Sequence, residues 1–166
     1  MVKYDIGSGR IYKEGYKRVD CDKETHPDIC CTAEEITQHI KKNTADKIRA
    51  YHIVEHVMPG VPLYNTLAGF WEVLKPNGTV EIAVPNTEYA MHAFARGEIT
   101  IDIAEKIILG SDPGATPFML HKVMFTRAKL KRYLEITGFI NIADVSNKKD
   151  EIIMTADKPD TGNGTD

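Results

Sequence analysis

The chain is poor in cysteine. Three cysteines, Cys21, Cys30 and Cys31, occur among its 166 residues. An odd number with two adjacent members is a poor basis for a disulfide framework, and the Cys-x-x-Cys pair of many zinc sites is missing. We therefore expect a reduced protein of the cytoplasm.

Long apolar runs and an excess of positive charge are also missing. No run approaches the roughly 18 apolar residues that a membrane span needs, and the first residues, MVKYDIGSGR, contain no apolar signal core. Lys and Arg number 21 against 24 Asp and Glu, for a formal charge of -3. We expect neither membrane insertion nor export, and a nucleic-acid partner is disfavoured because phosphate binding normally needs a basic face.

Short apolar runs alternate with helical patterns, which indicates an α/β domain with a largely parallel sheet. Strands are predicted at residues 2–6, 17–21, 28–31, 46–52, 79–85, 139–145 and 151–155. Helices are predicted at 33–42, 63–74, 88–96, 100–109 and 126–137, with a turn at 75–78. The last two strands should form an antiparallel hairpin at the sheet edge. We expect one domain over 1–156 and a disordered tail over 157–166.

Two segments follow predicted strands, where open α/β sheets bind ligands. The first is Asp5-Ile6-Gly7-Ser8-Gly9, whose glycines let the backbone turn and let a ligand approach without meeting a Cβ. Plain turn glycines are the alternative. The second is Val19-Asp20, which places a carboxylate where a ribose diol could donate two hydrogen bonds.

The spacing between these segments is short. Asp20 lies 11 residues after Gly9, whereas a dinucleotide fold has roughly 20 residues between its fingerprint and its acid. The seven or so residues left after a strand reach about 25 Å when extended, too little for a helix and its turns. The first helix should be missing or reduced to a loop. A pyrophosphate would lose its helix N-terminus, but S-adenosylmethionine carries no phosphate.

Successive segments of the chain resemble, in order, the motifs of class I S-adenosylmethionine-dependent methyltransferases. They are Asp5 to Gly9, Val19-Asp20, Ala50 to His56, Trp71 to Gly78 and Ile82 to Asn86. The resemblance covers roughly residues 2–156 and is greatest to compact members with a short first crossover. It implies a Rossmann-like, mostly parallel sheet with the first helix reduced or absent. It also implies S-adenosyl-L-methionine as cofactor and methyl transfer to a small molecule or sugar.

The resemblance also implies roles for single residues. Gly7 and Gly9 would border the methionine moiety, and Asp20 would hold the ribose hydroxyls. The cofactor site expected in this way consists of Asp5, Gly7, Ser8, Gly9, Asp20, Cys21, Thr32 and His52.

The adenine end departs from the family pattern. Family members commonly place an acid there after the third strand, where this chain has Cys31 and Thr32. Thr32 also forms a T-x-x-E capping box with Glu35, so capping a helix is its alternative role. The contacts to adenine are left open.

The segment His52-Ile53-Val54-Glu55-His56 also fits the H-x-x-E-H pattern of certain zinc peptidases. A zinc site of that kind needs a continuous helix, but this segment follows a strand and precedes Pro59. No third ligand is evident from the sequence. We therefore expect no metal, and we expect His52 to line the cofactor cleft, as a catalytic or a structural residue.

His121 is the candidate general base. It follows a loop rich in Gly and Pro, which could cover a substrate. An imidazole with a pKa near 6.5 can take a proton from a hydroxyl or amine acceptor. Anchoring the loop is the alternative role.

Tyr12 and Tyr16 lie in the shortened crossover and could cover sheet surface that a helix would otherwise bury. A second copy of the chain could cover it instead, so a homodimer through this face is a hypothesis. Two other functions stay open: a non-catalytic domain that binds S-adenosylmethionine or has degenerated, and an enzyme that cleaves the cofactor. The lack of a G-K-[ST] phosphate loop disfavours NTP hydrolysis.

Overall fold

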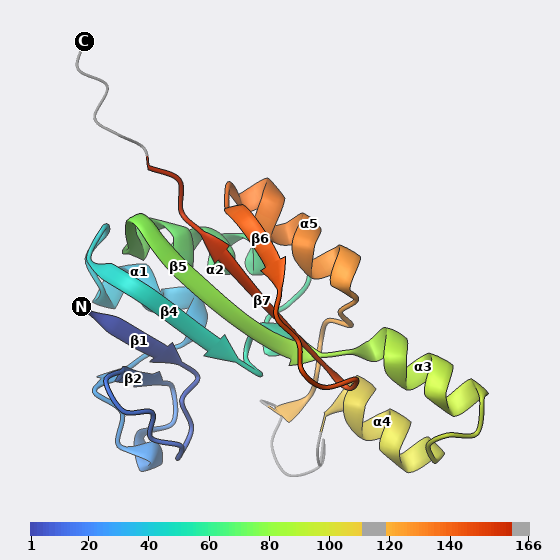
Figure 1. The fold of residues 1–166 in the computed structure, drawn as a ribbon. Helices are drawn as coiled ribbons and strands as arrows, with labels where there is room; N and C mark the ends of the chain where they lie inside the picture. Colours follow the sequence, from blue (N-terminus) through green and yellow to red (C-terminus); the bar gives the residue numbers. More distant parts are fainter. Residues whose placement is uncertain (111–118, 161–166) are drawn as a thin grey trace.

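The computed structural model describes residues 1–110 and 119–160, and these form one seven-stranded sheet with helices packed on it (Figure 1). The strand order is β3-β2-β1-β4-β5-β7-β6. The strands are β1 (Lys3–Ile6), β2 (Lys17–Asp20), β3 (Ile29–Cys30), β4 (Ala45–Tyr51), β5 (Leu74–Pro85), β6 (Ile140–Asp144) and β7 (Glu151–Asp157). Strands β1 to β5 pair in parallel, and β7 pairs antiparallel with both β5 and β6. The predicted α/β class and the C-terminal antiparallel pair are confirmed.

The described helices fall close to the predicted ranges. The α-helices are α1 (Ile36–His39), α2 (Val61–Val73), α3 (Thr87–Ala95), α4 (Ile101–Leu109) and α5 (Arg127–Thr137). Three short 3-10 turns are η1 (Lys23–Thr25), η2 (Ala33–Glu35) and η3 (Val54–His56). The helix predicted at 33–42 is shorter than expected, because it is split between η2 and α1 and ends at His39.

Helix α5 shows how local sequence sets these limits. The Thr126 hydroxyl accepts a hydrogen bond of 3.2 Å from the Lys129 amide at its start, and Gly138 ends it in the left-handed conformation. Leu130 and Leu134, four residues apart, are fully buried against the sheet. The cap, the apolar face and the terminal glycine therefore all agree on one helix.

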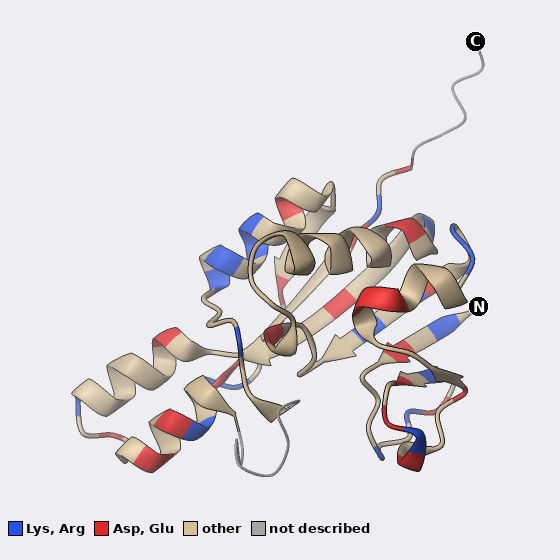
Figure 2. Cartoon of the chain, turned by 180° about the vertical axis from the view of Figure 1, so that it is seen from behind, with Lys and Arg blue, Asp and Glu red and all other residues tan. Residues whose placement is uncertain are grey.

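Helices α1, α2 and α5 cover one face of the sheet, while α3 and α4 pack against each other beyond the end of β5 (Figure 1). The core lies between this layer and the sheet, and Phe70 and Leu74 are fully buried in it, as the helical spacing of this cluster predicts. In Figure 2, turned by 180° from Figure 1, this helical layer lies in front of the sheet, with Lys and Arg gathered on α5 and little charge on α2.

The connection from β1 to β2 contains no helix, as its length predicts. The amides of Gly7 and Ser8 both donate to the carbonyl oxygen of Val19, at 2.8 and 3.2 Å. Hydrogen bonds to β2 thus hold the turn in the place where a longer crossover would have a helix N-terminus.

No described helix covers the sheet face opposite α2 (Figure 1). Charged side chains lie on this face. Arg49 pairs with Asp5 at 2.8 Å and stacks over the ring of Tyr51 at 3.5 Å. The Tyr51 hydroxyl donates to Glu81 at 2.7 Å, and Lys47 pairs with the same carboxylate at 2.6 Å. Ion pairs and hydrogen bonds between its own side chains therefore satisfy the charged groups on this face. Dimerisation through it stays a prediction.

The two tyrosines of the crossover differ in their surroundings. The Tyr16 ring lies 5.5 Å from the ammonium of Lys3, whereas Tyr12 is 70% exposed. The expectation that Tyr12 covers the sheet was therefore wrong.

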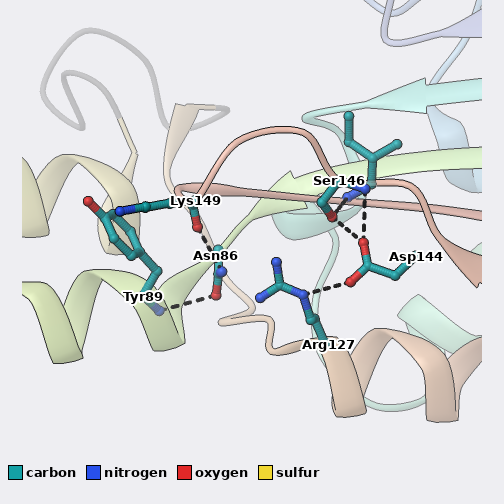
Figure 3. A network of polar contacts seen from close by, with 7 residues as sticks. Asn86, Tyr89, Arg127, Asp144, Ser146 and Lys149 are labelled. Carbon is teal, nitrogen blue, oxygen red and sulfur yellow. Dashed lines mark hydrogen bonds and ion pairs between the residues drawn. The ribbon is translucent and has the colours of Figure 1, made fainter.

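The loop between β6 and β7 is fastened to two helices (Figure 3). Asp144 accepts hydrogen bonds from Arg127 at 2.6 Å and from the Ser146 amide at 2.9 Å. The Asn86 side chain donates to the carbonyl of Lys149 at 2.8 Å and caps α3 by accepting from Tyr89. These contacts fix the start of β7 beside the carboxyl end of β5.

The sequence-based predictions for the start of β5 and for the start of the C-terminal tail were wrong. Residues 75–78, expected as a turn, are part of β5 and bulge out of the ladder between the pairs Ala45–Leu74 and Lys47–Thr79. The tail was expected from residue 157, but Asp157 ends β7 and Lys158 is buried. Its ammonium donates to the Asn43 side chain and the Leu74 carbonyl at 2.7 and 2.8 Å. Residues 161–166 of the predicted tail lie outside the described residues.

Candidate functional site

A cleft opens at the carboxyl ends of β1 and β4. These strands are neighbours, and the chain order runs away from β1 in both directions, first to β2 and later to β4. Such a switch point is where open α/β sheets bind ligands. The cleft has a volume of about 1210 Å³ and continues into a narrower recess of about 160 Å³. It is larger than the 300–1,000 Å³ common for sites that hold one small ligand.

Most of the predicted cofactor residues line this cleft. They are Gly7, Gly9, Asp20, Cys21, Thr32 and His52. Asp5 and Ser8 are not among the lining residues and are buried. Asp5 instead faces the charged side of the sheet, where it pairs with Arg49.

Asp20 is held in place by backbone amides. Its Oδ2 accepts a hydrogen bond of 2.7 Å from Gly9, and its Oδ1 accepts one of 2.9 Å from Asp22. Each carboxylate oxygen can accept a second hydrogen bond. Asp20 is nearly buried at the end of β2, so its free acceptor capacity is directed at the cleft that it lines.

The glycine turn leaves no room for larger residues at Gly7. Gly7 has φ +67°, and a Cβ there would lie 2.7 Å from Cδ1 of Ile53. Gly9 also has a positive φ, but open space surrounds it. Gly7 is therefore required by close packing of the turn against the segment after β4, and Gly9 by backbone conformation.

The narrow recess contains the residues expected near an adenine ring. Cys31 is buried, and burial together with nearby Glu35 raises the pKa of its thiol to about 11, so it is neutral at physiological pH. Thr32 caps η2 through the predicted box, with its hydroxyl donating to Glu35 at 2.9 Å. Glu34 also lines this recess. The sequence analysis named Cys31 and Thr32 at this place and did not consider Glu34, which stands two residues beyond Thr32.

His52 lies between two acids at the opposite side of the cleft. Its Nε2 is 2.7 Å from Glu151 of β7, and its Nδ1 is 3.3 Å from Oε1 of Glu55. The neighbouring Glu55 carboxylate raises the pKa of His52, and Glu151 raises it further. Burial acts in the opposite direction but is outweighed. His52 also has φ +54°, a left-handed conformation that few non-glycine residues adopt, although Asn, Asp and His adopt it more often than the others.

His121 reaches the same place from a distant part of the chain. The amides of Lys122 and Val123 both donate to the carbonyl of Glu55, at 2.7 and 3.1 Å. The His121 Nδ1 lies 3.2 Å from the carbonyl of Ile107 in α4, so His121 contacts the helix that precedes the loop. Its roles as general base and as loop anchor both stay predictions. Burial lowers the pKa of His121 below its ordinary value. The preceding segment proposed as a cover, residues 111–118, lies outside the described residues.

His56 completes this end of the cleft. Its ring meets that of His121 edge to face, with centroids 5.0 Å apart, and its Nδ1 lies 3.1 Å from the carbonyl of Leu120. The sequence singled out His56 only as part of the H-x-x-E-H pattern. That pattern does not form a peptidase helix here, because η3 is a single 3-10 turn.

The cleft thus has two chemically different ends. One end offers a buried carboxylate, a glycine turn and a recess in which apolar side chains such as Ile53 and Val57 lie beside Glu34 and Lys122, which suits a nucleoside. The other gathers three imidazoles with Lys106 and Lys148 on its wall. Both lysines come from segments in which the sequence shows no motif, so only the fold identifies them.

Comparisons with known proteins agree with this geometry at the level of fold. No protein-family model matches the sequence, and no curated protein matches it. An S-adenosylmethionine-dependent methyltransferase from Archaeoglobus fulgidus shares 18% identity at a TM-score of 0.65, over 94% of this chain and 85% of its own. The carbon methyltransferase CurJ shares 13% at a TM-score of 0.60, over 96% of this chain and 48% of its own.

A third similar structure holds the cofactor. Haemonchus contortus phosphoethanolamine N-methyltransferase 2, in complex with S-adenosyl-L-methionine, shares 13% identity at a TM-score of 0.62, over 96% of this chain and 49% of its own. The chain therefore spans about half the length of this protein and of CurJ. Among the described residues, no helix is long and apolar enough to cross a membrane.

Proposed function

Because the chain has the fold of class I S-adenosylmethionine-dependent methyltransferases, we propose that it binds S-adenosyl-L-methionine and transfers its methyl group to a small acceptor. The observation that carries this proposal is Asp20, a carboxylate at the end of β2 that lines the cleft and is fixed by two backbone amides. A ribose diol can donate two hydrogen bonds to such a group.

The cofactor is proposed to lie across the ends of β1 and β2. The ribose binds Asp20, the adenine enters the recess beside Cys31, Thr32 and Glu34, and the methionine part passes the turn at Gly7 and Gly9. The short crossover supports this cofactor over a dinucleotide, because no described helix begins there to hold a pyrophosphate.

The acceptor is proposed to occupy the end of the cleft at His52, His56 and His121. A cleft of about 1210 Å³ leaves space for a small molecule or a sugar beside the cofactor. The sulfonium of the cofactor makes its methyl group electrophilic, so the protein's main task is to align donor and acceptor. Alignment alone can contribute roughly 7–11 kcal/mol. His52 and His121 are the proposed groups at which the acceptor's proton is taken up.

Product analysis tests the proposed reaction. The protein is incubated with methyl-labelled S-adenosylmethionine and a panel of hydroxyl and amine acceptors, and both products are identified by mass spectrometry. The proposal expects S-adenosylhomocysteine and labelled acceptor in equal amounts. Cofactor fragments without a labelled acceptor would indicate cleavage instead, and saturable binding with no product would indicate a non-catalytic binding domain.

A further inference from the structure

The side chains of Glu55, His56 and His121 place one carboxylate and two imidazoles together, with their potential ligand atoms all within 4.8 Å of one another. The sequence argument against a metal depended on the lack of a third ligand beside the H-x-x-E-H segment. The fold supplies one from 65 residues farther along the chain, at His121. We propose that Glu55, His56 and His121 bind a divalent transition-metal cation at the edge of the cleft.

Glu55 is the strongest indication. Its side chain is fully buried, and neither carboxylate oxygen accepts a hydrogen bond from residues 1–110 or 119–160. A buried carboxylate without partners is costly and is normally neutralised, paired or bound to a metal. His52 lies 3.3 Å from Oε1, an ion-pair distance without the alignment of a hydrogen bond. Within residues 1–110 and 119–160, Oε2 of Glu55 takes part in no ion pair.

The two histidines are oriented as metal ligands usually are. The Nδ1 of His56 lies 3.1 Å from the Leu120 carbonyl, and that of His121 lies 3.2 Å from the Ile107 carbonyl. A carbonyl oxygen can only accept, so each Nδ1 carries a proton, and in the neutral imidazole each Nε2 then keeps its lone pair. Metal-ligating histidines commonly donate their other N–H to a carbonyl in this way.

The backbone already holds the three ligands near each other. Glu55 and His56 are adjacent in η3, and the amides of Lys122 and Val123, just after His121, both donate to the Glu55 carbonyl. In a tetrahedral zinc site with bonds of about 2.0–2.1 Å, ligand atoms lie about 3.4 Å apart. Side-chain adjustments on the order of 1 Å therefore suffice for all three to bind one ion.

The donor set selects the class of cation. Two imidazoles and one carboxylate suit zinc and other divalent transition metals, whereas magnesium prefers oxygen ligands and retained water. Three protein ligands leave at least one position open, as in catalytic zinc sites. His56 and His121 line the cleft while Glu55 lies behind them, so the open position faces the cleft. There a hydroxyl of the acceptor could bind, a step that rests on the proposed function. With the ion bound, His121 is a ligand, so His52 alone is left to take up the acceptor's proton.

Titration of the metal-free protein with Zn²⁺ alone tests the site, by calorimetry and by the visible absorption of Co²⁺ in its place. We expect one ion per chain, and no displacement by Mg²⁺ at the same concentration. Glu55→Gln and His121→Gln should each weaken Zn²⁺ binding by at least about 100-fold, since losing an outer-shell partner alone costs about 10–100-fold. His92→Gln, an exposed histidine of α3, is the matched control and should change nothing.

Other outcomes would overturn the proposal. They are no binding by the wild type, binding that His121→Gln leaves intact, or equal binding of Mg²⁺. A buried pair between His52 and Glu55 alone would give no Zn²⁺ binding. Circular dichroism confirms that each variant is folded, and His121→Gln serves if Glu55→Gln does not fold. No step of the titration uses S-adenosylmethionine, so failure of the proposed methyl transfer would leave its result unchanged.

Discussion

The backbone amide of Gly9 donates a hydrogen bond of 2.7 Å to Oδ2 of Asp20. The glycine turn after β1 and the acid that ends β2 therefore form one unit, although the crossover between them contains no helix. The second carboxylate oxygen accepts from Asp22. The carboxylate is oriented before any ligand arrives, which lowers the cost of ordering it on binding.

Replacing this carboxylate should loosen both loops. We expect Asp20→Ala to lower the free energy of unfolding by about 1.5–3 kcal/mol, because two backbone amides lose a charged acceptor. Urea denaturation followed by circular dichroism measures the change. Asp102→Ala, an exposed acid of α4, is the control and should stay within about 0.5 kcal/mol of wild type. Equal stability of the two variants would show that the Asp20 contacts do not hold the loops.

Two glycines with nearly the same backbone conformation allow the cost of backbone strain to be measured apart from the cost of a steric clash. Gly7 has φ +67° with Ile53 against its Cβ position, and Gly97 has φ +70° with open space around it. Gly97→Ala should cost only the conformational penalty, on the order of 1 kcal/mol. Gly7→Ala should cost about 1–3 kcal/mol more, because Ile53 must also move. Thermal denaturation of both variants checks this, and similar losses would contradict the close contact.

Lys158 lies beyond the predicted end of the domain at residue 156, yet it is buried. Its ammonium donates to Asn43 and Leu74 and lies 4.0 Å from the centre of the Trp71 ring. We expect Lys158→Ala to lower the free energy of unfolding by about 1.5–3 kcal/mol, the usual range for hydrogen bonds to a charged group. The free energy of unfolding of this variant is compared with that of a chain from which residues 161–166 are removed and Lys158 is kept. A Lys158→Ala variant with the same free energy of unfolding as the wild type would mean that the chain after β7 is not anchored in solution.

The charged sheet face predicts an unusual tyrosine titration. Burial and the hydrogen bond to Glu81 raise the pKa of Tyr51 to about 12, against about 10 for an ordinary tyrosine. Because the folded-state pKa is raised, this group's stabilising effect is complete below about pH 10 and disappears as the pH rises through about 12. Ultraviolet absorbance titration should show one late-titrating tyrosine that Tyr51→Phe removes. Glu81→Gln should move that step to lower pH, and an unchanged curve in both variants would contradict the network.

Some of this site could be predicted from sequence because its signals are local. The glycine turn, Asp20 and the missing helix follow from residues within one crossover, where chain length alone excludes a helix. The capping box of Thr32 and Glu35 is equally local, since it acts within one turn of its own helix.

The rest depends on contacts between distant segments. His121 comes close to Glu55 because the next two amides, of Lys122 and Val123, donate to the Glu55 carbonyl, and the sequence does not encode this pairing as a motif. Asp5 was assigned to the cofactor by its place beside the glycines, but the strand alternation turns it to the face of Arg49. The Lys75 to Gly78 segment has turn residues yet joins β5 as a bulge, because the sheet continues on both sides of it.

The most direct test of the central claim is calorimetric titration with S-adenosylmethionine and with S-adenosylhomocysteine. It compares the wild type, Asp20→Asn and the control Asp102→Asn, each verified as folded. The account predicts saturable binding at one site per chain, weakened about 10- to 100-fold in Asp20→Asn and unchanged in Asp102→Asn. Wild-type protein that binds neither ligand at millimolar concentration, or an Asp20→Asn variant that binds as tightly as wild type, would contradict it.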